Sequence, residues 1–182
     1  MNPEEEDLQL RLNQPHKRAA AFSSIVRLYQ ERLYWHIRKM VLSHEDANDV
    51  LQNTFMKAWN GIEGFRGDSQ ISTWLYRIAT NETLTFLSNK QLRNTSSIDN
   101  TDEILLQNLR ADNYFDGNEL QFKLQKAILT LPEKQRLVFN MKYFDDITYE
   151  SLSDILGTSV GALKASYHHA VKKIEKYFDE DE

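Results

Sequence analysis

The apolar residues of this chain recur every three or four positions, the repeat that places them on one face of an α-helix. Between residues 19 and 42 this face carries Phe22, Ile25, Val26, Tyr29, Leu33, His36, Ile37 and Met40. No stretch alternates apolar and polar residues for long enough to indicate a β-sheet. The spacing therefore predicts an all-α fold.

Two further helical runs follow in the first half of the chain. The stripe of the first run consists of Ala47, Val50, Leu51, Thr54, Phe55, Ala58 and Trp59. The second run extends from Trp74 to Leu87. The glycines at 61, 64 and 67, with the Asp68-Ser69 pair, predict a loop between the two runs. We expect one packed helical domain over residues 16–93, preceded by an acidic N-terminal extension over residues 1–15.

The composition changes over residues 94–119, which are rich in Asp and Asn and contain only scattered apolar residues. Turn-forming pieces such as Asp116-Gly117 occur here. We interpret this stretch as an acidic linker with a short helix over residues 103–109. The alternative is a long surface loop within one domain, although loops of this length are uncommon in compact domains.

The second domain is expected over residues 120–178, before an acidic tail at 179–182. Its first apolar stripe consists of Phe122, Leu124, Ile128 and Leu129. Pro132 suits the first turn of the next helix, which continues to Phe144 and is broken by Asp145-Asp146.

A helix-turn-helix is predicted at the end of this domain. Thr148 can cap a short helix with Leu152, Ile155 and Leu156 on its inner face. Gly157 follows where the chain must turn, a position that favours a residue tolerant of positive φ. Ser159 can then cap a long second helix. Two helices joined by a short glycine-containing turn are the signature of a DNA-binding helix-turn-helix.

The second helix of this motif is basic on one side only. Its expected outer face carries Lys164, His168, His169, Lys172, Lys173 and Lys176. Such a helix lies in the major groove with its first residues at base edges and its later cations at phosphates. The alternative is an ordinary helical hairpin whose lysines are merely solvated.

The formal net charge of −5 conceals an uneven distribution. The net charge is −3 over 1–15, +4 over 16–93, −5 over 94–119, +3 over 120–177 and −4 over 178–182. Two basic blocks separated by acid permit DNA contact in spite of the total charge.

Several functions are not expected. The chain has no cysteine for disulfides or thiolate metal sites, and His168 and His169 point about 100° apart without a ligand four residues away, so we expect no metal. Neither a phosphate-binding glycine loop nor a nucleophile with its base is present, and we expect no enzyme and no cofactor. An acidic N-terminus and the lack of a span of about 18 apolar residues predict a cytoplasmic protein without membrane insertion.

Read together, these segments resemble the extracytoplasmic-function group of bacterial RNA polymerase sigma factors. The resemblance rests on the stretches 46–59, 65–69 and 73–81 in the first block, and on 131–136 and 161–166 in the second. It implies a two-domain, non-enzymatic initiation factor that reads the −10 and −35 promoter elements and helps to melt DNA. The implied partners are promoter DNA, the β′ clamp helices and β flap of core RNA polymerase, and an anti-sigma factor.

The resemblance assigns residues to each of these contacts. It places Asp49, Gln52 and Asn53 against core polymerase, although family members often have glutamates at Asn48 and Asn53. The expected −10 contacts, on the loop 67–73 and the helix 74–81, are Ser72, Thr73, Trp74, Tyr76, Arg77 and Asn81. Trp74 has a second interpretation as a core residue. The family usually has a basic residue at position 80, and an aspartate and an arginine at Thr85 and Ser88.

The expected −35 contacts are Gly161, Lys164, Ser166, His168, His169 and Lys172. Ser166 and His169 stand where arginines are common in the family. An arginine grips guanine with two hydrogen bonds and a serine cannot. This difference implies either another −35 sequence or a larger share of phosphate contacts. The linker is expected to thread the cationic channel that RNA later occupies.

Two alternatives remain open from the residues alone. The chain could be a dimeric helix-turn-helix regulator that senses a ligand through its N-terminal block. Alternatively, that block could be a protein-interaction module whose single role is to recruit a partner. The dimeric regulator leaves the aromatic run and the Gly-Asp-Ser loop, at 67–69, of the first block unexplained.

Overall fold

The structure, a computed structural model, describes residues 3–65, 67–93 and 119–180. Every regular element in these three ranges is a helix, which confirms the all-α prediction. The chain divides into two compact units, the first over residues 1–41 and 45–93 and the second mainly over 94–182. The linker residues 94–118, with the short helix expected there, lie outside the described ranges.

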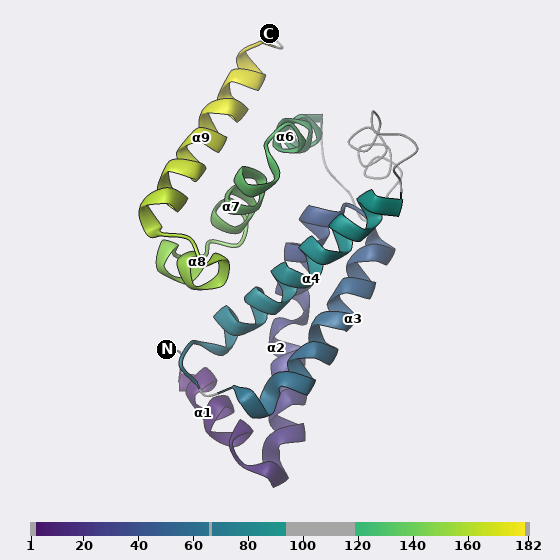
Figure 1. The fold of residues 1–182 in the computed structure, drawn as a ribbon, viewed down its shortest axis with the longest axis vertical. Helices are drawn as coiled ribbons and strands as arrows, with labels where there is room; N and C mark the ends of the chain where they lie inside the picture. Colours follow the sequence, from purple (N-terminus) through teal and green to yellow (C-terminus); the bar gives the residue numbers. More distant parts are fainter. Residues whose placement is uncertain (1–2, 66, 94–118, 181–182) are drawn as a thin grey trace. The chain divides into compact units, whose positions relative to one another are not determined.

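The first unit contains four α-helices and one 3-10 turn (Figure 1). They are α1 (Pro3–Leu12), α2 (Pro15–Val41), α3 (His44–Gly61), η1 (Ile62–Gly64) and α4 (Ile71–Arg93). Helix α2 forms the centre of the unit, because α1 and α4 both pack against it. Its buried face follows the predicted spacing and includes Ala21, Ile25, Tyr29, Leu33, Ile37 and Met40.

Helix α1 was not expected from the sequence. Its acidic composition conceals two apolar residues one turn apart, Leu8 and Leu12, which are both buried. Glu, Gln, Leu and Arg all form helices readily, so this segment needs only these two anchors to pack on α2. The N-terminal extension is thus part of the first unit.

Two boundaries differ from the prediction around the glycine loop. Gly61 is the last residue of α3, and a 3-10 turn follows it. Helix α4 begins at Ile71, so Ser72 and Thr73 lie in its first turn, whereas the sequence placed them in the loop. The amide of Trp74 donates to the carbonyl of Gln70 over 3.0 Å, and Ile71 is fully buried, which together start the helix early.

The second unit contains four described helices. They are α6 (Glu119–Leu129), α7 (Glu133–Tyr143), α8 (Tyr149–Leu156) and α9 (Val160–Asp179). Pro132 is the N-cap of α7, one residue before the first-turn position that was expected. Arg136 donates from Nη2 to the carbonyls of Leu129 and Leu131, at 2.7 and 3.2 Å, and so satisfies acceptors at the end of α6.

The core of this unit joins α6, α7 and α9 around one aromatic stack. Phe139 on α7 stacks on Tyr143 of the same helix and on Tyr167 of α9, with ring centroids 5.1 and 5.8 Å apart. Burial raises the pKa of the Tyr167 phenol. Aromatic pairs of this kind add about 0.5–1.5 kcal/mol beyond the buried area, so they fix α9 on α7.

Within the described ranges, no helix has both the length and the apolar character needed to cross a membrane.

Candidate functional site

The helix-turn-helix of α8 and α9 has the local geometry that the sequence predicts. The side chain of Thr148 caps α8 by accepting from the amide of Ser151 over 3.2 Å. Gly157 ends α8 in the left-handed region, at φ 62°, and its amide donates to the carbonyl of Ser153. Ser159 caps α9 by accepting from the amide of Ala162 over 3.3 Å. All three capping predictions are confirmed.

The outer face of α9 is solvent-exposed, as predicted. Its exposed residues are Gly161, Lys164, His168, His169, Lys172, Lys173 and Lys176, and Ser166 is half-buried. On the opposite side, Leu163, Ala170 and Ile174 are buried against the core. The helix therefore presents a face of lysines and histidines, beside a glycine that leaves its first turn open to close approach.

Tyr149 on α8 holds two lysines of this unit in place. The ammonium of Lys164 lies 5.6 Å from the centre of the Tyr149 ring, and that of Lys142 lies 5.7 Å away. Cations at this distance are attracted by the ring face. Tyr149 thus orients the lysine that stands in the first turns of α9, and the sequence analysis did not single it out.

The exposed face of α3 carries the three residues predicted to contact polymerase. Asp49, Gln52 and Asn53 are exposed, and their side chains make no hydrogen bond or ion pair within the described part of the chain. Ala47, Val50, Thr54 and Ala58 are buried on the other side of the helix.

This face continues into a residue that the sequence analysis missed. Met56 lies two turns after Asp49 on the same face and is 57% exposed. The helical spacing from Asp49 could have identified it. Trp59 was predicted on the buried stripe but is 42% exposed, with its ring in tilted contact with Phe22 of α2 at a 5.1 Å centroid distance.

Trp74 lies at the start of α4 beside the loop. Its ring is half-buried and packs on Phe65 with a 4.8 Å centroid distance. The other near neighbour is Gly61, where a Cβ would lie 3.7 Å from Cζ2 of Trp74. Trp74 is therefore neither fully in the core nor free, and its ring keeps an exposed part.

Thr73 and Tyr76 point into the unit instead of toward solvent. They are 5% and 4% exposed. Tyr76 packs edge-on against His36 of α2, with ring centroids 5.0 Å apart. His36 is itself fully buried, and its Nε2 lies 3.1 Å from Oγ1 of Thr80. The predicted direct base contacts of Thr73 and Tyr76 would need these side chains to leave the core.

The remaining predicted −10 residues lie nearer the surface. Ser72 and Arg77 are half-buried and Asn81 is exposed. The Nε of Arg77 is buried without a hydrogen-bond partner. Leaving this buried donor without a partner is energetically costly.

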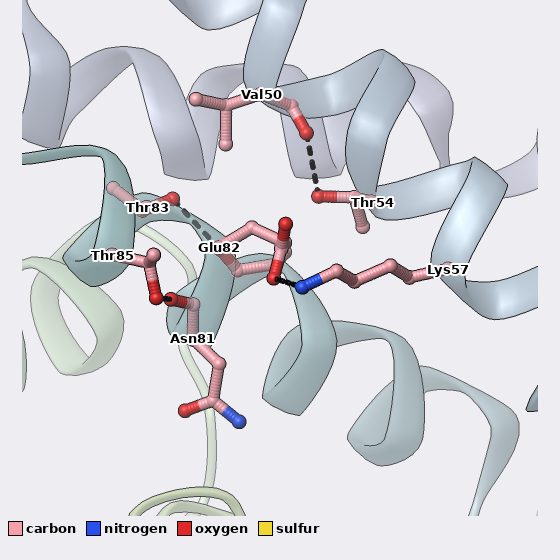
Figure 2. A network of polar contacts seen from close by, with 8 residues as sticks. Val50, Thr54, Lys57, Asn81, Glu82, Thr83 and Thr85 are labelled. Atoms are coloured by element: carbon pink, nitrogen blue, oxygen red, sulfur yellow. Dashed lines mark hydrogen bonds and ion pairs between the residues drawn. The ribbon is translucent and has the colours of Figure 1, made fainter. Parts of the chain in front are cut away.

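Two ion pairs join α3 to α4, and the first of them is next to Asn81. Lys57 meets Glu82 at 2.5 Å and Lys90 meets Asp46 at 2.6 Å. Figure 2 shows Lys57 reaching from α3 to Glu82, beside Asn81. The hydroxyls of the buried Thr54 and Thr83 donate to carbonyls of their own helices, at 2.8 and 2.7 Å.

In the three described ranges, no group of three or more His, Asp or Glu side chains is arranged to hold a metal ion. What these ranges contain is a set of exposed surfaces on helices: a polar face on α3, a partly aromatic one at the start of α4, and a cationic one on α9.

Such a combination defines a DNA-binding protein of transcription, in which a helix-turn-helix module is joined to a separate helical module. The chain matches the Sigma-70 region 2 family over residues 25–93 and the Sigma-70, region 4 family over residues 121–174. It belongs to the ECF group of RNA polymerase sigma factors.

Curated relatives agree with this membership. The chain is 30% identical to the ECF RNA polymerase sigma-E factor of Escherichia coli (strain K12) over 165 residues, which cover 85% of each protein. It is 29% identical to the ECF RNA polymerase sigma factor SigW of Bacillus subtilis (strain 168) over 164 residues, or 86% of this chain and 88% of the relative.

Solved structures share the fold. CnrH, described in complex with the cytosolic domain of CnrY, has a TM-score of 0.71 and 19% identity, with 98% of this chain and 99% of that chain covered. The sigma factor RpoE, described in complex with the anti-sigma factor NepR from Bartonella quintana, has a TM-score of 0.67 and 20% identity, with 88% and 98% covered.

Proposed function

We propose that this sigma factor uses three separate surfaces in initiation. The exposed face of α3, with Asp49, Gln52 and Asn53, binds the β′ clamp helices of core polymerase. The start of α4 and the loop before it hold the melted −10 strand. The basic face of α9 reads the −35 duplex. The proposed modules are residues 16–93 and 120–178, with α1 added to the first because it packs on α2.

The observation that carries the proposal is the separation of exposed polar faces from buried ones on the three helices. Asp49, Gln52 and Asn53 share one side of α3, while the other side is core. A polar helix face that makes no contact of its own suits a partner of complementary charge.

For the −10 strand, the supporting geometry is the cluster of Trp74, Arg77 and Asn81 on α4. An unstacked base needs an aromatic surface, and the strand needs a cation on its backbone. The exposed part of the Trp74 ring and the half-buried guanidinium of Arg77 meet these two needs. We assign Thr73 and Tyr76 a supporting role beneath this surface, since both are buried.

For the −35 duplex, the supporting geometry is the exposed start of α9. Gly161 and Lys164 lie where a recognition helix meets base edges, and His168, His169 and Lys172 lie where it meets phosphates. The half-buried Ser166 would contribute less than the arginine common in its place, so phosphate contacts would carry a larger share of the binding.

In this proposal the chain only binds, and core polymerase carries out RNA synthesis. We place this activity in the cytoplasm, where core polymerase and the chromosome are located. We also propose an anti-sigma partner, since RpoE, a sigma factor of the same fold, is described in complex with the anti-sigma factor NepR.

The proposal is tested by reconstitution with core RNA polymerase on a random promoter library, with runoff transcripts sequenced. We expect transcripts to start downstream of a shared pair of elements, whereas core enzyme alone shows no such preference. A stable complex with core enzyme that gives no promoter preference would refute the assignment of the DNA surfaces. The absence of any complex would refute the assignment of α3.

A further inference from the structure

Helix α1 precedes the part of the chain that matches the family, which begins at residue 25. It nevertheless contacts the segment that joins α3 to α4, the same segment assigned above to the −10 strand. Contacts occur near the start, the middle and the end of α1, and each of them bears on residues between 63 and 72.

The end of α1 is joined to η1 by Arg18 of α2. The Nε of Arg18 donates to the carbonyl of Leu12 over 3.1 Å, and its Nη1 pairs with the carboxylate of Glu63 over 2.6 Å. One guanidinium therefore holds the last residue of α1 and the turn that leads into the loop.

The middle of α1 lies against the loop itself. Gly67 has φ 79°, a conformation that L side chains rarely adopt, and a Cβ built there would collide with the side-chain amide of Gln9. The Oε1 of Gln9 is buried and has no hydrogen-bond partner. The Gln9 side chain therefore packs in the space beside the Gly67 backbone. This contact has an energetic cost, because the buried Oε1 of Gln9 lacks a hydrogen bond.

The start of α1 reaches α4 through a buried polar relay. Glu5 is only 7% exposed, and its carboxylate accepts a hydrogen bond from the phenol of Tyr29 on α2. The Ser72 hydroxyl, at the start of α4, lies close enough to the Tyr29 phenol to act to lower its pKa. Burial, followed by the bond to Glu5, raises the pKa of Tyr29, so the phenol keeps its proton as the donor.

We propose that α1 is a positioning element of the −10 site, in which Gln9 holds the loop at Gly67 in the conformation that captures the melted strand. This inference rests on the proposed function of that loop. Because a loop that is already ordered loses less conformational entropy when it captures a base, α1 increases affinity without touching DNA.

The test uses full-length protein assembled with core polymerase and a fluorescent single-stranded −10 oligonucleotide, with a scrambled oligonucleotide as reference. Gln9→Ala removes the contact with Gly67 and keeps the helix. Gln9→Met restores a side chain of similar length without the amide. Leu10→Ala is the matched control, since Leu10 lies on the same helix and is 65% exposed.

We expect Gln9→Ala to weaken binding of the −10 oligonucleotide about fivefold to tenfold, as small displacements of binding groups do, with unchanged affinity for core enzyme. Gln9→Met and Leu10→Ala should bind like the parent protein. Thermal unfolding measured in parallel should show that every variant is folded at the assay temperature.

Unchanged or tighter oligonucleotide binding by Gln9→Ala would overturn the inference, and so would a parallel loss of core affinity, which indicates a general folding role. Binding by Gln9→Met as weak as by Gln9→Ala would also overturn it, because packing alone would then be insufficient. If the parent protein itself does not prefer the −10 oligonucleotide to the scrambled one, the proposed function of the loop fails first.

Discussion

Lys57 on α3 and Glu82 on α4 form an ion pair with 2.5 Å between Nζ and Oε1 (Figure 2). The lysine side chain is 62% exposed and the glutamate side chain 14%. The pair thus places a cation of α3 over the carboxylate of Glu82, which follows Asn81 on α4. Its electrostatic effect is to neutralise a negative charge where a DNA strand is proposed to lie.

Replacing Lys57 with alanine should weaken DNA binding more than it weakens the fold. An exposed ion pair contributes about 0–1 kcal/mol, so the free energy of unfolding in urea should fall by less than about 1 kcal/mol. The unpaired Glu82 should then repel the −10 strand and lower the affinity of the holoenzyme for a single-stranded oligonucleotide. Adding Glu82→Gln should restore that affinity, and a double variant that binds as weakly as Lys57→Ala would contradict this explanation.

Reversing the charge of Asp49 should weaken binding to core polymerase. We expect Asp49→Arg to fold normally and to lose about 1–3 kcal/mol of binding free energy, the effect of a like charge at a complementary interface. Glu31→Arg, which reverses another exposed acid of the first unit, is the control. Equal affinity of the two variants in a fluorescence titration with core enzyme would exclude α3 from the interface.

Removing the indole of Trp74 should impair promoter melting selectively. Stacking on an aromatic ring contributes about 1–3 kcal/mol per captured base. Trp74→Ala holoenzyme should locate promoters but leave thymines near the −10 element unreactive toward permanganate. Trp35→Ala, which removes an exposed tryptophan of α2, should melt them normally. Normal melting by folded Trp74→Ala would assign Trp74 to packing with Phe65 only.

Lys164 and Lys172 of α9 should contribute to DNA binding in different ways, one to sequence preference and the other to affinity for any sequence. Lys164→Ala should change the preferred −35 sequence, because Lys164 lies in the first turns of α9 beside Tyr149. Lys172→Ala should weaken all sequences alike and reduce the salt dependence by about one unit. Binding measured over a range of salt concentrations separates these results, and parental values for both variants would mean that the face is only solvated.

The two glycines of the helix-turn-helix, Gly157 in the turn and Gly161 in α9, should respond differently to replacement by alanine. Gly157 has φ 62°, and a Cβ there would meet no atom within 4 Å, so Gly157→Ala should lower the free energy of unfolding by about 1–2 kcal/mol through backbone strain alone. Gly161→Ala places alanine inside α9 and should raise it by up to about 1 kcal/mol. Urea unfolding of the two variants provides the comparison, and similar changes in both would contradict the role of φ.

The features that were predicted correctly depend on interactions between residues that are close together in the sequence. The caps at Thr148 and Ser159 and the left-handed Gly157 follow from the bonding of residues three or four positions away. Helix α1 was missed because its formation depends on the packing of Leu8 and Leu12 on α2. In the sequence, Leu8, Leu10 and Leu12 alternate with polar residues after a run of four acids, which is not a helical repeat.

In the candidate site, the exposed residues of a single helix could be predicted from the sequence, whereas contacts between distant segments could not. Helical spacing indicated that Asp49, Gln52 and Lys164 face outward, and they are exposed. The burial of Tyr76 could not be predicted, because it depends on His36, forty residues earlier in the chain, which lies against its ring. The sequence also gave no indication that Gln9 would meet Gly67, since the two belong to segments that come together only in the fold.

The contact between His36 and Thr80 limits how this factor could be converted to the promoter preference of a relative. The resemblance to the family implies a basic residue at position 80, but here Thr80 is buried and its Oγ1 lies 3.1 Å from Nε2 of His36. A lysine introduced at position 80 alone would place an ammonium in this buried space beside His36, at the cost of removing its charge from water. Transferring the proposed −10 residues of another sigma factor to this chain would therefore require position 36 to be changed together with position 80.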